Sequence, residues 1–169
     1  MKRGFAPSRG EDILHQTMAV GSRQVEQRMG RLAERCRDRG LRLTHQRVEV
    51  FRALAASQEH PDAETLYRRA RPRVAGLSLD TVYRTLAFLE RLGLVRKADV
   101  VRGSVRWDAN CDRHHHFVCT RCGLVRDVYS DELDRLREPE GLREIGQVLS
   151  SDVYFRGVCS ACLRRRRRG

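Results

Sequence analysis

The sequence predicts an α+β protein, with an N-terminal winged helix-turn-helix domain followed by a small α/β domain. Three observations support this prediction. Four segments with apolar residues three or four positions apart lie between residues 25 and 92, two short β-like segments follow them, and short strands alternate with helical segments after residue 110. With 169 residues, 40% of them hydrophobic, the chain can build one packed domain or two small ones.

Three helices are expected after residues 1–24, which lack periodicity and which we interpret as a flexible basic tail. The first begins at Val25, Thr44 caps the second, and Asp62 begins the third, which ends before Pro72. The residues expected on their buried faces are Met29, Leu32, Ala33, Cys36, Val48, Phe51, Leu54, Ala55, Leu66, Tyr67 and Ala70.

A fourth helix, capped by Ser78 and ended by Gly93, carries the polar face that would meet a ligand. Its expected buried stripe comprises Leu79, Val82, Leu86 and Leu89. Its opposite face comprises Asp80, Arg84, Ala87 and Arg91, with Thr81 and Tyr83 at the margins. Segments 94–98 and 104–108 then form a hairpin through a turn at Arg102-Gly103. Such a helix fits the major groove of DNA, with the hairpin along the backbone. A helical interaction module with a merely solvated polar face is the alternative.

Charge favours the DNA-binding interpretation. The net charge is +12, of which residues 1–109 carry +9 and residues 110–169 carry +3. This asymmetry indicates a phosphate-rich partner for the N-terminal part, although a solvated surface from an arginine-rich proteome would also account for it. No apolar run approaches the ~18 residues of a membrane span, and no apolar segment follows the basic N-terminus. We therefore expect a soluble cytoplasmic protein without membrane contact.

The C-terminal part, residues 110–163, is expected to form a small α/β unit. Strands are predicted over 114–118, 124–129 and 152–158, with helices over 131–137 and 142–148 separated by Pro139. A unit of about 55 residues is near the lower limit for independent stability, so metal binding or dimerisation should help to hold it. Residues 164–169 form an Arg-rich tail that we interpret as a solvated terminus, with added nucleic-acid affinity as the alternative.

Two Cys-x-x-Cys pairs predict a structural zinc site. Zinc prefers four thiolates in a tetrahedron, and four cysteine ligands leave no open position for catalysis. A redox-active dithiol is the alternative, but one metal explains two such pairs in one small domain more simply. The expected ligands of Zn²⁺ are Cys119, Cys122, Cys159 and Cys162.

A second cluster combines histidines with carboxylates. His114 and His116 share one face of the predicted strand while Cys119 points the other way, so these histidines cannot easily join the thiolate site. Nitrogen and oxygen ligands from these histidines, Asp108 and Asp127 suit Fe²⁺, Mn²⁺ or Zn²⁺, and the first two are favoured without a thiolate. The alternative is a polar strand face, and His60 alone would be interpreted as a capping residue.

Several ordered motifs resemble the ferric uptake regulator (Fur) superfamily of bacterial metal-dependent repressors. The resemblance extends from about residue 38 to 163 and rests on segments 42–47 (RLTHQR), 59–61 (EHP), 80–86 (DTVYRTL), 114–123 (HHHFVCTRCG) and 157–162 (GVCSAC). It implies a homodimer in which residues 25–109 form the DNA-binding domain and residues 110–163 the dimerisation domain. Double-stranded operator DNA, palindromic and AT-rich, is the implied partner.

The resemblance also assigns roles to single residues. It implies structural Zn²⁺ on the four cysteines and a regulatory Fe²⁺ or Mn²⁺ that fixes the angle between the two domains. The implied regulatory ligands are His60, Asp108, His114, His116 and Asp127. The residues expected to contact DNA are Tyr83 and Arg84 at the bases, with Thr81 and Arg42 at the backbone or minor groove.

The branch of the superfamily is less clearly marked. Asp127 resembles the peroxide-sensing PerR branch, in which Fe²⁺ reacts with hydrogen peroxide, a ligand imidazole (His60 or His114) is oxidised and DNA is released. Mn²⁺ would support repression without that chemistry. Arg84 resembles the recognition helix of the iron-uptake branch instead, so an iron, manganese or zinc uptake regulator is the alternative.

Three departures from the family pattern affect these expectations. A further metal site of the family lacks its histidines, because the expected positions hold Arg113 and Ser151; we assign His115 and Asp134 no ligand role. Asp80 replaces a small residue and is expected to alter base preference. We interpret Cys111 as a spare buried cysteine, although a thiolate there would favour zinc.

Two functions of other classes are the alternatives to a repressor. A zinc hydrolase or deaminase would carry His-Glu-x-x-His, or His-x-Glu with Pro-Cys-x-x-Cys, and neither motif occurs. A metal-buffering or RNA-binding zinc module explains the cysteines and the charge but not a five-ligand set spread over two domains.

Overall fold

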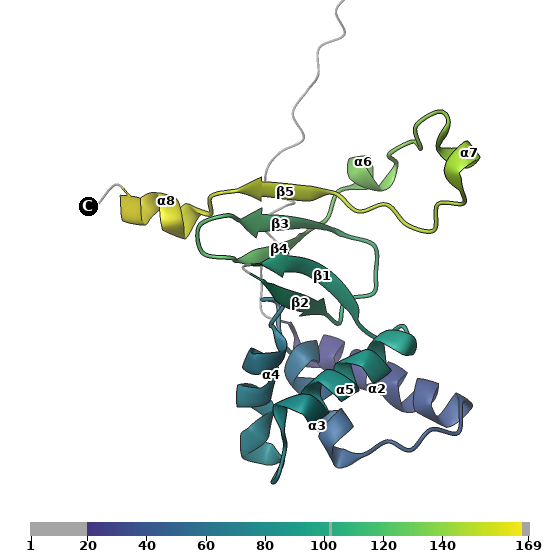
Figure 1. Ribbon diagram of the computed structural model, residues 1–169, viewed down its shortest axis with the longest axis vertical. Coiled ribbons are helices and arrows are strands. Elements are labelled where there is room, and N and C mark those ends of the chain that lie inside the picture. The colour runs from purple at the N-terminus through teal and green to yellow at the C-terminus, as the bar shows by residue number, and fades with distance from the viewer. Residues whose placement is uncertain (1–19, 102, 167–169) are drawn as a thin grey trace, which may run out of the picture.

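The computed structural model describes residues 20–101 and 103–166 and confirms the α+β class. Helices occupy the N-terminal part, a two-stranded hairpin follows, and a three-stranded sheet lies beyond the hairpin (Figure 1). Among the described residues, no helix combines the length and the apolar composition that crossing a bilayer demands.

The four helices of the N-terminal part are α2 (Ser22–Asp38), α3 (His45–Ala55), α4 (Ala63–Ala70) and α5 (Leu79–Arg91). The side chains of Thr44, Asp62 and Ser78 accept hydrogen bonds from backbone N–H groups at the starts of α3, α4 and α5, so all three predicted N-caps are confirmed. The predicted boundary at Val25 is wrong, because α2 already begins at Ser22. Residues 1–19 of the predicted tail lie outside the described part.

A single apolar core joins these helices. Its largest fully buried members are Leu32, Val50, Phe51, Leu54, Leu66, Val82, Leu86 and Leu89. Five residues predicted to be buried differ. Ala33 is exposed, and Met29, Tyr67 and Leu79 are partly buried at the edge of the core. Val48 is also only partly buried, because α3 turns Val50 toward the core instead. After α4, Pro72 lies within a short 3-10 turn, η1 (Arg71–Arg73).

The hairpin consists of β1 (Arg96–Val101) and β2 (Ser104–Asp108), paired antiparallel. The second strand matches its predicted segment, but the first lies two to three residues later than predicted, since Leu94 and Val95 are buried in the link from α5. The register shifts between Lys97 and Asp99. Of the predicted turn, Arg102 lies outside the described residues, and Gly103 has φ +78°.

The second sheet has the strand order β4-β3-β5. Its central strand, β3 (His115–Cys119), pairs antiparallel with β4 (Val125–Val128) and parallel with β5 (Tyr154–Gly157). The predicted helices over 131–137 and 142–148 are too long: only α6 (Asp131–Asp134) and α7 (Leu142–Ile145) form. Neither buries a residue, so no packing energy extends them past the neighbouring glycines and proline.

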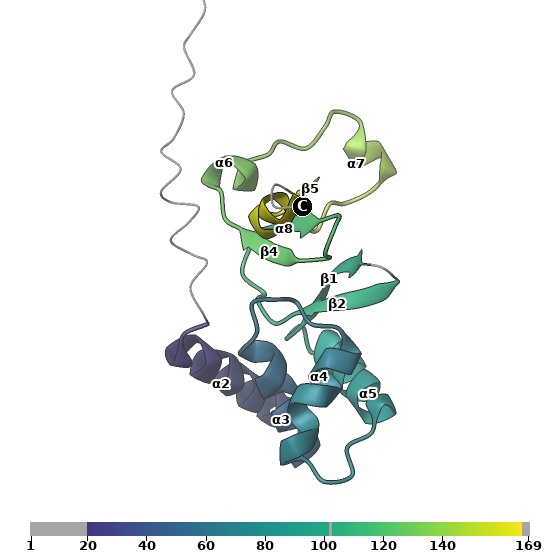
Figure 2. The same ribbon diagram turned by 90° about the vertical axis from the view of Figure 1, so that its left-hand side faces the viewer.

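The chain closes with α8 (Ser160–Arg166), which includes the first three arginines of the predicted solvated tail. The hairpin lies between the helices and the three-stranded sheet in both views (Figures 1 and 2). Val101 of the hairpin forms a small apolar cluster with Val118 and Val125 of the sheet, and the Asp99 carboxylate lies 3.1 Å from the Arg156 guanidinium. The helical part and the three-stranded sheet are therefore connected through contacts of the hairpin.

Candidate metal centres

Four cysteine thiols converge at one end of the three-stranded sheet. Cys119 ends β3, Cys122 lies in the following turn, Cys159 follows β5 and Cys162 lies in α8. Their sulfur atoms all lie within 4.8 Å of one another, and the Sγ atoms of Cys122 and Cys159 are 3.7 Å apart. Four Zn–S bonds of ~2.3 Å in a tetrahedron place sulfur atoms about 3.8 Å apart, so this spacing fits zinc. A disulfide would require ~2.05 Å.

The electrostatics of the thiols also favour a bound cation. Burial opposes ionisation of Cys119, but the backbone N–H groups of Cys159, Cys122 and Arg121 outweigh it and lower the pKa of the Cys119 thiol to about 6. The sulfur atoms of the other three cysteines raise the pKa of Cys162 to about 12. Four thiolates at this spacing repel one another, so all four ionise together only around a positive charge.

A second cluster lies where the helical part, the hairpin and the sheet meet. His60 precedes α4, Asp108 ends β2, and His114 and His116 lie at the start of β3. One ligand atom from each of these four residues lies within 4.8 Å of the others. Asp127 of β4, the register partner of His116, lies beside the group. Residues from both predicted domains therefore contribute.

Distances within the cluster are those of a compact polar pocket. The Nε2 atoms of His114 and His116 are 3.1 Å apart, and His114 Nε2 lies 3.1 Å from Asp108 Oδ2. His60 Nε2 lies 2.9 Å from Asp127 Oδ1 and 3.7 Å from Asp108 Oδ1. Asp127 is thus the most peripheral member, in contact with His60 and 3.6 Å from His114 Nε2.

Burial without hydrogen bonding identifies the cluster as a site that needs a further group. His60, Asp108, His114 and His116 are each at most 4% exposed. Both ring nitrogens of His60, Nδ1 of His116 and Oδ1 of Asp127 lack a hydrogen-bond partner of acceptable geometry. Buried polar atoms are nearly always hydrogen-bonded in folded proteins, and a metal ion would satisfy these atoms together. The residues present therefore fit a divalent cation.

The protonation states of His116, Asp108 and Asp127 also suit metal ligation. Burial and the nearby positive charges of His114 and His60 lower the pKa of His116 to about 4, so its ring is neutral at pH 7. Burial disfavours the ionised forms of Asp108 and Asp127, but the close contacts and positive charges of His60 and His114 outweigh it and hold both pKa values below the usual range. Neutral imidazole and ionised carboxylate are the forms that bind metal.

The backbone at His60 is strained. Its φ of +47° makes it the one non-glycine residue with positive φ among residues 20–101 and 103–166. An L-residue in this conformation costs about 1–2 kcal/mol, and such positions cluster at functional sites. In this conformation the His60 ring contacts Asp127, with Nε2 2.9 Å from Oδ1.

Sequence reasoning missed three residues that support the cluster. Asn110 donates its side-chain N–H to Asp127 Oδ2 (3.0 Å) and its backbone N–H to Asp108 Oδ1 (2.6 Å), and Tyr129 donates its hydroxyl to Asp127 Oδ2 (3.3 Å). Arg96 contacts both Asp108 and His114. Asn110 lies two positions after an aspartate, which is typical of a local side-chain turn, but no sequence signal marks Tyr129 or Arg96.

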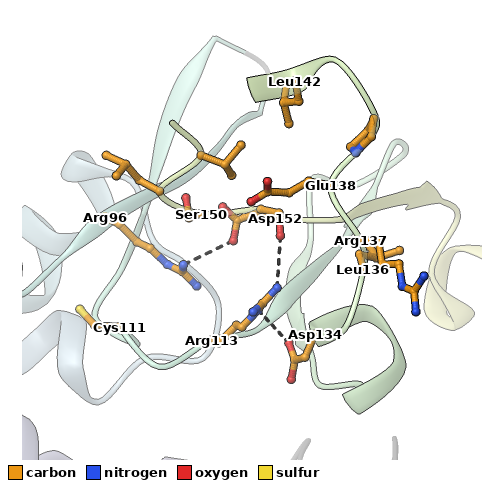
Figure 3. Close-up of a pocket in the computed structure, with 14 residues that line it drawn as sticks. Arg96, Cys111, Arg113, Asp134, Leu136, Arg137, Glu138, Leu142, Ser150 and Asp152 are labelled. Atoms are coloured by element: carbon orange, nitrogen blue, oxygen red, sulfur yellow. Dashed lines mark hydrogen bonds and ion pairs between the residues drawn. The ribbon is translucent and has the colours of Figure 1, made fainter. Parts of the chain in front are cut away.

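The four residues at the positions of the family's further metal site, which lacks its histidines here, lie together: Arg113, His115, Asp134 and Ser151. The Arg113 Nε lies 3.3 Å from Asp134 Oδ1 (Figure 3). Arg113 also donates to Ser151 Oγ (3.2 Å), and Asp134 Oδ1 lies 3.3 Å from His115 Nε2. A guanidinium therefore lies among these groups. Cys111 lines a cavity together with Arg113 and Asp134 and is exposed, so its interpretation as a buried cysteine is wrong. It lies in the link between β2 and β3, where its thiol donates to the Gly93 carbonyl (3.4 Å).

The predicted DNA-contacting residues lie near the surface of the helical part. Tyr83 and Arg84 are exposed on α5, Arg42 is exposed ahead of α3, and Thr81 is partly buried, with its hydroxyl 2.9 Å from Ser78 Oγ. One feature is new: the Arg84 guanidinium lies 2.8 Å from the Asp80 carboxylate, one turn earlier on the same helix. Asp80 therefore orients the side chain predicted to contact bases.

Comparisons with known proteins point to one family. The model of the "Ferric uptake regulator family" matches residues 38–151. The chain is 33% identical over 131 residues to the ferric uptake regulation protein of Synechococcus elongatus, covering 75% of this chain and 89% of the relative. It is 29% identical over 126 residues to the peroxide-responsive repressor PerR of Staphylococcus epidermidis, covering 75% and 84%. A solved structure of the ferric uptake regulator from Pseudomonas aeruginosa with manganese aligns with TM-score 0.61 and 28% identity over 76% of this chain and 97% of that one.

Proposed function

The chain belongs to the ferric uptake regulator family, a family of metal-dependent regulators rather than enzymes, and on this premise we propose that it is a repressor that binds double-stranded operator DNA as a homodimer. The observation that carries the proposal is the meeting of His60, from the helical part, with Asp108, His114 and His116 within 4.8 Å. A metal ion held by these side chains would fix residues 25–109 against residues 110–163. It would thereby favour one spacing of the two recognition helices in a dimer.

Each cluster is proposed to hold a different metal. The thiolates of Cys119, Cys122, Cys159 and Cys162 fit structural Zn²⁺, as their spacing and mutual repulsion indicate. The nitrogen and oxygen atoms of His60, Asp108, His114, His116 and Asp127 fit regulatory Fe²⁺ or Mn²⁺. The manganese in the related Pseudomonas aeruginosa structure supports that second assignment.

DNA recognition is assigned to α5. Tyr83 and Arg84 are exposed there and are the proposed base contacts, with Thr81 and Arg42 at the backbone or minor groove. Arg84 is held by Asp80, which presents the guanidinium in a defined direction and lowers its net attraction to phosphate. An oriented guanidinium suits bidentate contact with guanine. The proposed operator is therefore palindromic, with a preferred base pair opposite Arg84 in each half-site.

Selection from a random duplex library tests this function directly. Zinc-loaded protein with Mn²⁺, in the absence of oxygen, is expected to enrich a palindrome, and chelation of Mn²⁺ should abolish binding to the enriched sequence. Arg84→Ala is expected to cost about 1–3 kcal/mol on that sequence and to relax the preference at one position per half-site. Equal weakening on the selected sequence and on random DNA would contradict a base contact, and metal-independent binding would contradict the regulatory role.

Within this function we propose a peroxide response. The support is Asp127, whose short carboxylate contacts His60 at 2.9 Å, and the similarity to the Staphylococcus epidermidis repressor. Bound Fe²⁺ supplies the chemistry that transfers one oxygen atom of hydrogen peroxide to an imidazole carbon, while the other oxygen leaves as water. His60 and His114 are the proposed acceptors, and an oxidised ring no longer binds metal as before, so the domain arrangement would be lost and DNA released.

Mass spectrometry separates this response from its alternative. Anaerobic protein loaded with Fe²⁺ or Mn²⁺ receives low hydrogen peroxide, and the same samples are assayed for DNA binding and for intact mass. A peroxide sensor gains one oxygen in the Fe²⁺ form only and releases DNA. Fe²⁺-dependent binding that survives peroxide without a mass change would instead establish an iron or manganese uptake regulator.

The uptake regulator is the second candidate because two observations favour it. The Synechococcus elongatus iron regulator is more similar in sequence than the Staphylococcus epidermidis repressor, at 33% against 29% identity. Arg84 also resembles the iron-uptake branch. A zinc-responsive variant of this candidate would require the exposed Cys111 thiol to approach the cluster, which a Zn²⁺ titration of Cys111→Ser against the unaltered chain would detect.

A further inference from the structure

Arg96 places a positive charge inside the His/Asp cluster. It is the first residue of β1 and the register partner of Asp108. Its Nε lies 3.2 Å from Asp108 Oδ2, and its terminal nitrogen lies 2.8 Å from His114 Nδ1 and 2.9 Å from His114 Nε2. The guanidinium thus contacts two of the proposed metal ligands, one from the hairpin and one from the start of β3.

Arg96 occupies positions beside the atoms that a metal ion needs: its Nε contacts Asp108 Oδ2, and one terminal nitrogen lies about equally far from both ring nitrogens of His114. Asp108 Oδ2 faces both Arg96 Nε and His114 Nε2, so its coordinating capacity is already occupied. Arginine is a permanent cation with donors only, and a divalent ion bound at the same oxygen would be repelled by it at close range. Metal entry therefore requires the guanidinium to withdraw from Asp108 and His114.

The structure also contains a second partner for the guanidinium. Its other terminal nitrogen lies 3.5 Å from Asp152 Oδ1, in the segment that precedes β5. Arg96 and Asp152 lie side by side on the wall of an open cavity of about 710 Å³, with Arg113 and Asp134 paired on another part of its wall (Figure 3). The cavity leaves room for the Arg96 side chain to move toward Asp152 without disturbing the core.

We propose that Arg96 is a built-in competitor of the regulatory metal: its guanidinium neutralises Asp108 in the metal-free protein and transfers to Asp152 when the metal binds. This inference rests on the proposed metal-dependent function and adds a residue that sets the metal concentration at which the protein responds. It also makes the segment before β5 sensitive to metal occupancy, because that segment gains the charge that the cluster releases.

Mn²⁺ binding to the full-length, zinc-loaded chain tests the proposal, with free Mn²⁺ measured by its electron paramagnetic resonance signal. Arg96→Gln is expected to bind Mn²⁺ at least 10-fold more tightly than the unaltered chain, whereas a supporting residue would weaken binding when removed. Asp152→Asn removes the alternative partner and is expected to weaken Mn²⁺ binding several-fold. Arg113→Gln, an arginine on the same cavity that does not contact the cluster, is the matched control with unchanged affinity.

The outcomes are separable. Equal or weaker Mn²⁺ binding by a folded Arg96→Gln chain overturns the role of Arg96 and leaves the proposed function standing. If Arg96→Gln does not fold, Asp152→Asn decides, because unchanged or tighter binding by that variant overturns the proposal. Binding by Arg96→Gln but not by the unaltered chain supports competition while overturning metal regulation of the natural protein, and binding by neither overturns both.

Discussion

The helical part and the three-stranded sheet are stabilised in different ways. The helices bury leucine, valine and phenylalanine side chains in one continuous core. Among the described residues, the apolar cluster at the three-stranded sheet consists of Val101, Val118 and Val125, and Val101 comes from the hairpin. Most of the fully buried large side chains in this part are three histidines: His114, just before β3, and His115 and His116 within it.

This difference indicates a division of labour. The helical part has the apolar burial that stabilises a domain by itself, whereas the sheet positions metal ligands at the expense of its own core. The sheet is therefore expected to depend on the thiolate cluster for its fold and on the His/Asp cluster only for its arrangement against the helices. Four changes test this comparison, from the largest expected effect to the smallest.

Removal of zinc should produce the largest effect. In Cys159→Ser/Cys162→Ser, the sheet is expected to lose its fold, because structural zinc contributes about 10–16 kcal/mol in small zinc domains and the sheet has little else. Hydrogen exchange should show loss of protection over β3 and β4 with protection retained in α3 and α5. Equal loss of protection in both parts would show that the two fold as one unit.

A cavity created in the helical core should have the opposite effect: it should destabilise the helices and leave the sheet folded. Leu86→Ala is expected to destabilise the helices by about 2–5 kcal/mol, since Leu86 is fully buried in α5. Zinc content, measured by elemental analysis, should remain at one ion per chain. Loss of zinc in this variant would mean that the sheet relies on the helices more than its own contacts suggest.

Removal of His60 should uncouple the two parts without unfolding either. His60→Ala is expected to weaken Mn²⁺ binding at least about 100-fold, since even residues that only support a metal ligand cost 10- to 100-fold. The thermal unfolding of the metal-free chain should hardly change, because both ring nitrogens of His60 lack a hydrogen-bond partner that the substitution would remove. A large fall in metal-free stability would assign His60 a mainly structural role.

The smallest effect is expected at a helix cap. Ser78→Ala removes the acceptor for the backbone N–H of Thr81 and should cost about 1 kcal/mol of helical stability. Denaturant unfolding followed at Trp107, which packs in the helical core, measures this change. A matched Ser150→Ala substitution in the segment before β5 should leave the same transition unchanged.

Local signals predicted the parts of the fold that local interactions determine. Capping residues fixed three helix starts, and alternating side chains fixed β2, because these features depend on neighbours in sequence. The lengths of α6 and α7 were overestimated, since helical periodicity there meets no surface on which to pack. The parallel pairing of β3 with β5 joins segments far apart in sequence, and no local pattern reports it.

The same limit applies to the sites. Spacing and chemistry predicted the members of both clusters except His60, which only the family resemblance assigned as a ligand. The structure brings them together, with Asp127 at the margin of the second cluster. Arg96 and Tyr129 escaped prediction because a side chain that supports a ligand needs only to be near it in space. Asp80 was expected to alter base preference, and the contact of its carboxylate with the Arg84 guanidinium one turn away could not be read from the sequence alone.

The order of the ligands along the chain has a consequence for how the protein is first loaded during its synthesis. The last residue of the His/Asp cluster is Asp127, and the thiolate set is complete only at Cys162. The ribosome adds the intervening 35 residues in about 2–7 seconds. During that interval a nascent chain carries all five nitrogen and oxygen ligands but only two of the four thiols. Because the sheet is expected to need zinc for its fold, the ligands made first can be arranged as a site only after the last thiol has been added.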